Sequence, residues 1–69
     1  MSSVYINNNV SGNADISLIT MTGKQVINKN VTIKAGQPYN LDLENQPSEI
    51  YILQITTNGG TYNNKIVVN

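Results

Sequence analysis

Apolar residues recur mostly at every second position along this chain, and this period limits the possible folds more than any other feature. A period of two places alternate side chains on opposite faces of an extended strand, whereas a helix requires a period near 3.6. The repeat runs through Ile16 and Leu18, Leu41 and Leu43, Tyr51, Leu53 and Ile55, and Tyr62, Ile66 and Val68. No segment has the helical period, so the sequence predicts an all-β fold.

Short strands separated by turns are predicted along the whole chain. The strands are expected at residues 4–8, 14–21, 24–31, 38–43, 50–57 and 61–68. Thr22-Gly23 and Asn58-Gly59-Gly60 indicate tight hairpins, because glycine and asparagine tolerate a positive φ. Residues 35–37 and 44–48 form longer connections, and the second is expected to cross between sheets. This spacing is typical of an antiparallel β-sandwich, and 69 residues suffice for one domain.

Several kinds of chemistry are excluded by residues that the chain lacks. It contains neither cysteine nor histidine, so disulfides, the common zinc ligands and the common catalytic triads are absent. The four carboxylates are scattered, which disfavours a calcium site. Asp42 and Glu44 would share one face of a strand, but a polar outer face explains them better than an acid–base pair. We expect no enzyme activity, no metal and no cofactor.

The charged residues also argue against nucleic acid and membranes as partners. The chain has four lysines, four acidic residues and no arginine, and its charges are dispersed. A nucleic-acid or anionic-membrane partner would require a basic patch. No apolar run is long enough to cross a membrane, and no export signal is found at the N-terminus.

Four tyrosines, at positions 5, 39, 51 and 62, allow two interpretations. They could form a stacking platform for sugar rings. Tyrosines spread over four strands are more often half-buried anchors whose hydroxyls remain hydrated, and we favour this second interpretation.

Four motifs together resemble one known family. They are MTGKQV at 21–26, YNLDL at 39–43, PSEIYILQI at 47–55 and KIVV at 65–68. In this order and spacing, the chain resembles the type A C-terminal sorting domain of the type IX secretion system, the Por secretion tail. It departs from the family at Gln46 and Glu49, where members usually carry an apolar residue and a glycine. The family also commonly opens with a Tyr-Pro-Asn-Pro segment and a first strand. We therefore expect residues 1–69 to be a single sorting domain with a truncated N-terminal part.

The resemblance implies a small immunoglobulin-like sandwich of about six to seven strands and a role in protein transport. Such domains follow a cargo protein and are recognised by the outer-membrane export machinery of Bacteroidota. The cargo is released to the cell surface or medium, and a sortase-like peptidase often removes the domain. The last strand can offer both its backbone edge and its side chains to that machinery. The candidate recognition residues are Gly23, Lys24, Lys65, Ile66, Val67 and Val68.

The sequence is also compatible with two other functions. The chain could be a generic immunoglobulin-like adhesive or spacer module, or a small carbohydrate-binding module that uses its tyrosines and asparagines.

The predicted first strand has an unprotected edge, because residues 4–8 carry no charge. If a first strand is missing, this unprotected edge should self-associate, either edge to edge or by exchange of a terminal strand.

Overall fold

The computed structural model describes residues 3–9, 11–43 and 45–68, and its secondary structure consists of strands and turns. Its strands are β1 (Ser3–Ile6), β2 (Gly12–Thr20), β3 (Gln25–Ile33), β4 (Tyr39–Asp42), β5 (Ile50–Thr57) and β6 (Gly60–Val67). Each overlaps one predicted strand, which confirms the all-β prediction. No helix capable of spanning a membrane occurs among the described residues.

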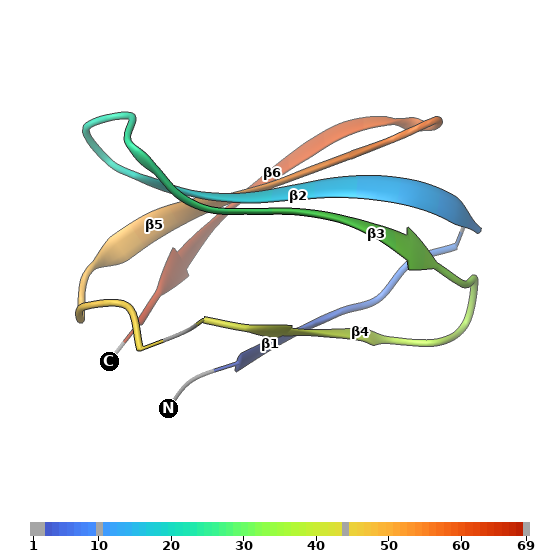
Figure 1. Ribbon diagram of the computed structural model, residues 1–69, viewed down its shortest axis with the longest axis horizontal. Coiled ribbons are helices and arrows are strands. Elements are labelled where there is room, and N and C mark those ends of the chain that lie inside the picture. Colours follow the sequence, from blue (N-terminus) through green and yellow to red (C-terminus); the bar gives the residue numbers. More distant parts are fainter. Residues whose placement is uncertain (1–2, 10, 44, 69) are drawn as a thin grey trace.

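The strands form two antiparallel sheets that face each other (Figure 1). One sheet has four strands in the order β3-β2-β5-β6, and the other contains β1 and β4. The predicted crossing at residues 44–48 is confirmed, because β4 belongs to the small sheet and β5 to the large one. The sandwich prediction is therefore confirmed, while the immunoglobulin likeness stays a prediction.

The β2–β3 hairpin contains the positive φ that the sequence predicts. Gly23 has a φ of 95°, and its N–H donates to the Thr20 carbonyl at 2.9 Å. The Lys24 N–H donates to the Thr20 side-chain hydroxyl at 3.0 Å. Lys24 is thus held in the turn, and β3 begins at Gln25, one residue later than expected.

The β5–β6 hairpin is equally tight. Asn58 and Gly59 connect Thr57 to Gly60, which are directly paired. Gly60 has a φ of 130°. The Gly59 N–H donates to the Thr57 hydroxyl at 3.1 Å. The predicted need for a positive φ in this turn is therefore confirmed.

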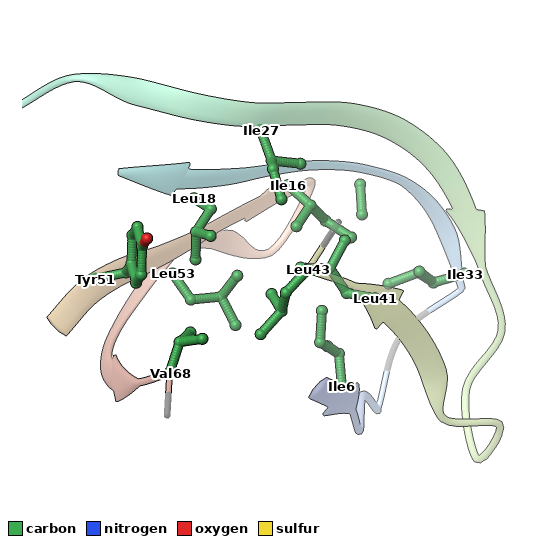
Figure 2. Packing of buried hydrophobic residues seen from close by; sticks show 11 residues of the cluster. Ile6, Ile16, Leu18, Ile27, Ile33, Leu41, Leu43, Tyr51, Leu53 and Val68 are labelled. Carbon is green, nitrogen blue, oxygen red and sulfur yellow. The ribbon is translucent and has the colours of Figure 1, made fainter. Parts of the chain in front are cut away.

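The core lies between the two sheets and follows the period of two (Figure 2). Its buried residues are Ile6, Ala14, Ile16, Leu18, Ile27, Ile33, Leu41, Leu43, Tyr51, Leu53 and Val68. Tyr51 is fully buried and Tyr39 is half-buried, as expected of anchors. Tyr5 and Tyr62, in contrast, are 67% and 58% exposed. The expectation of half-buried tyrosines is therefore wrong for these two, and they lie on β1 and β6.

Gly23→Val should lower the free energy of unfolding by about 1–3 kcal/mol, because a β-branched residue resists a positive φ. A Cβ at this position would meet no atom within 4 Å, so the cost arises from the backbone conformation alone. Gly23→Asn is the matched control, since asparagine tolerates this region better and should cost less. Chemical denaturation measures both variants. Equal losses for Val and Asn would contradict this account of the turn.

Candidate recognition surface

The last strand, β6, is an edge strand whose side chains alternate between the two faces of the large sheet. β6 pairs with β5 on one side, placing Lys65 beside Ile52 and Val67 beside Ile50. Directly paired residues share a face of the sheet. Lys65 and Val67 therefore lie on the outer face, and both are exposed. Ile66 is half-buried and packs against the core.

The outer face of the large sheet carries an apolar patch near the end of β6. The register aligns Ile19 with Ile52 and Ile52 with Lys65, next to the pair formed by Ile50 and Val67. Val67 is 63% exposed and Ile50 is 43% exposed. We call this set of residues the terminal patch: Ile19, Ile50, Ile52, Lys65 and Val67.

The sequence-based candidates omitted three residues of the terminal patch, namely Ile19, Ile50 and Ile52. The sequence did contain a signal for them. Apolar residues are continuous at 18–19 and 50–53. A strand with one solvated face should alternate, so a continuous run indicates an apolar side chain on the outer face.

The Gly23-Lys24 turn lies at the same end of the large sheet as the terminal patch. Thr20, which precedes the turn, pairs with Tyr51, and Tyr51 pairs with Ile66. Lys24 is exposed. The structure thus brings all six candidate residues to one end of the sandwich. They do not all share a face, because Ile66 and Val68 pack inward.

Contacts to the connection before β5 hold the end of the chain in place. The Val68 N–H donates to the Glu49 carbonyl at 3.0 Å, and the Val68 side chain is only 5% exposed. Figure 2 shows this side chain among those of the core. The Tyr51 hydroxyl donates to the Pro47 carbonyl at 2.6 Å. Val68 and Ile66 therefore serve as anchors, while Lys65 and Val67 are presented to solvent.

Polar side chains cover the rest of the outer face and bond to one another. Asn28 donates to both Asp15 and Ser17 at 2.9 Å. Gln54 donates to Asn63 at 3.2 Å. These mutual bonds hold the polar half of the face in an ordered array. The terminal patch is therefore the apolar part of an otherwise polar sheet surface.

The described residues show no arrangement that would hold a metal ion. Among them, no three Asp, Glu, His or Cys side chains form a potential metal-binding group. Asp42 is exposed on β4. Glu44, which was predicted to share its face, lies outside the described residues.

Comparison with known proteins identifies one family. Residues 1–69 match the family model described as a secretion system C-terminal sorting domain. No curated protein and no solved structure gives a significant match to the chain.

Tyr51→Phe should lower Tm by roughly 4–8 °C, because the variant loses the hydrogen bond from the Tyr51 hydroxyl to the Pro47 carbonyl, and one typical hydrogen bond has an effect of this size in a domain of this length.

The same variant should change the pH dependence of stability. Burial, and to a lesser degree the Glu49 carboxylate, raises the pKa of the Tyr51 hydroxyl. Above about pH 10, the unfolded chain should lose this proton while the folded chain keeps it, so stability should fall as pH rises. The wild type should therefore lose Tm more steeply than Tyr51→Phe between about pH 9 and 11. If Tm fell equally with pH in the wild type and in Tyr51→Phe, the Tyr51 hydroxyl would not be the source of this pH dependence.

Proposed function

Because the chain belongs to the family of type IX secretion system C-terminal sorting domains, we propose that it directs a larger upstream cargo through the outer membrane. The family implies a C-terminal sorting signal, and it is not an enzyme family. The cargo would be delivered to the cell surface or medium. A sortase-like peptidase would then cut upstream of the domain.

The observation that best supports this proposal is the terminal patch beside the end of the chain. An exposed apolar patch near a charged side chain is typical of a protein-binding surface. Val67 and Ile50 supply apolar contact area, and Lys65 supplies one positive charge. In this proposal, Lys24 adds a second charge at the same end, and Gly23 fixes the turn that carries it.

The position of β6 at the sheet edge suggests how the machinery reads the signal. An edge strand can bind a partner through its backbone or through the side chains of its outer face. Ile66 and Val68 hold the strand against the core, so Lys65 and Val67 are presented in a fixed order. Recognition therefore requires a folded domain, and the exposed residues make the contact.

An export assay can separate recognition from folding. A signal peptide, a fluorescent protein and this chain are fused in that order and expressed in a host with a type IX system. The wild-type fusion should reach the surface or medium, whereas deletion of residues 65–69 should leave it in the periplasm. That deletion also removes the anchor Val68, so a point variant is needed to isolate the contact.

Lys65→Glu should reduce the exported fraction on the order of tenfold, equivalent to losing about 1.4 kcal/mol of binding. Asn63→Glu is the matched control, because it introduces the same side chain two residues away on the same face of β6. Both positions are exposed, so Tm should change little. Equal export of both variants would refute the role of the terminal patch. Retention of the wild-type fusion in the periplasm would refute the sorting function itself.

A further inference from the structure

The sequence contains a single asparagine–glycine step, Asn58-Gly59, and the fold places it in an exposed turn. The two residues connect β5 to β6 at the tip of a hairpin that projects from one end of the large sheet (Figure 1). Both residues are exposed. The Asn58 side chain makes no hydrogen bond to any residue that the structure describes. Its amide is therefore free to rotate toward the backbone of the turn.

An asparagine that precedes glycine can react with its own backbone. The nitrogen of the next residue attacks the side-chain carbonyl carbon, and the bond from that carbon to the amide nitrogen breaks. A five-membered succinimide closes, while ammonia leaves with the proton of the attacking N–H. Water then adds to one of the two ring carbonyls, giving either aspartate or isoaspartate, whose backbone runs through the side-chain carbon. Because the attack is intramolecular, the only other reactant is water.

The nitrogen that must attack is accessible in this turn. The Gly59 N–H donates to the Thr57 hydroxyl at 3.1 Å, and this bond is exposed. Water can therefore replace the hydroxyl without breaking a backbone pair of the sheet. The pair formed by Thr57 and Gly60 closes the turn at the end of its ladder, where local opening costs least. Gly59 also has no side chain to obstruct the approach of the amide.

From these features we infer that Asn58 is a modification site that converts spontaneously to aspartate and isoaspartate in the folded protein. Both products add a negative charge to a chain whose formal net charge is zero at pH 7. Isoaspartate also lengthens the turn by one backbone carbon, which disturbs the pair formed by Thr57 and Gly60. The site lies at the start of β6, so the inference does not depend on recognition of the terminal patch at the other end.

The purified 69-residue chain can be incubated at mildly alkaline pH and its acidic products separated by anion exchange. Mass spectrometry of proteolytic peptides then locates the conversion. The rate at Asn58 should lie within about tenfold of the rate in a capped peptide of residues 55–61, because a hairpin tip opens at little cost. The rate should rise with pH, since the attacking nitrogen must lose its proton.

Asn63 is an internal control in the same experiment. It is exposed like Asn58, but its side-chain oxygen accepts a hydrogen bond from Gln54 at 3.2 Å. It lies within the paired part of β6 and precedes Asn64 rather than a glycine. Asn63 should therefore remain unchanged while Asn58 converts.

Gly59→Ala should slow the conversion of Asn58 at least about tenfold, because a methyl group beside the attacking nitrogen hinders ring closure. A Cβ at this position would meet the hydroxyls of Thr57 at 3.6 Å and Tyr62 at 3.7 Å, which are ordinary contacts, so Tm should change little. The isoaspartate product should have a Tm lower by roughly 4–8 °C, the effect of losing one hydrogen bond. Asn58→Asp adds the same charge with a normal backbone and should lower Tm less.

Three outcomes would overturn the inference. Conversion of Asn58 in the folded chain that is more than about tenfold slower than in the peptide would show that the turn protects this residue. Equal conversion of Asn58 and Asn63 would show that the turn does not select the site. Undiminished conversion in Gly59→Ala would exclude attack by the backbone nitrogen of residue 59.

Discussion

The antiparallel pairing of β2 with β5 is the contact on which the rest of this structure depends. The hairpins β2–β3 and β5–β6 are local, and an isolated hairpin is only marginally stable. Their union through the register from Asp15–Thr56 to Thr20–Tyr51 creates a sheet with one face that can cover a core. The same register brings the Gly23 turn and the end of β6 to one end of the sandwich. A one-residue slip would reverse the faces of Ile16 and Leu18 and remove both results.

Local features of this fold follow from the sequence, whereas the relation between the sheets does not. β5 has the predicted bounds, and the Gly23 turn has the predicted sign of φ, because both depend on residues close together in the chain. Alternation assigns Tyr62 to an inward face. It cannot indicate that the small sheet is too narrow to cover β6, so the exposure of Tyr62 was missed. Ile19 and Ile52 were missed for a different reason. The continuous apolar runs at 18–19 and 50–53 indicate an outward apolar side chain, but only the pairing of β2 with β5 shows that the two residues lie side by side.

The end of β6 serves both the core and the surface. Ile66 and the following Val68 pack against the core, whereas Lys65 and Val67 belong to the terminal patch on the outer face. In the proposed function, the domain needs no reactive group. It needs a surface that the export machinery can bind, and that surface must keep one conformation. The anchoring of Val68 to Glu49 provides that fixed conformation at the very end of β6. In the proposed function, stability and recognition are therefore linked through a single strand.

Site-specific photo-crosslinking along β6 tests the central claim most directly. A photoreactive residue is placed singly at Thr61, Asn63, Lys65 or Val67 of an exported fusion. These four positions are exposed and share the outer face, so they differ mainly in their distance from the end of the chain. The account predicts crosslinks to the outer-membrane export machinery from positions 65 and 67 and few from 61 and 63. Crosslinks of equal yield along the strand, or strongest at 61 and 63, would contradict it.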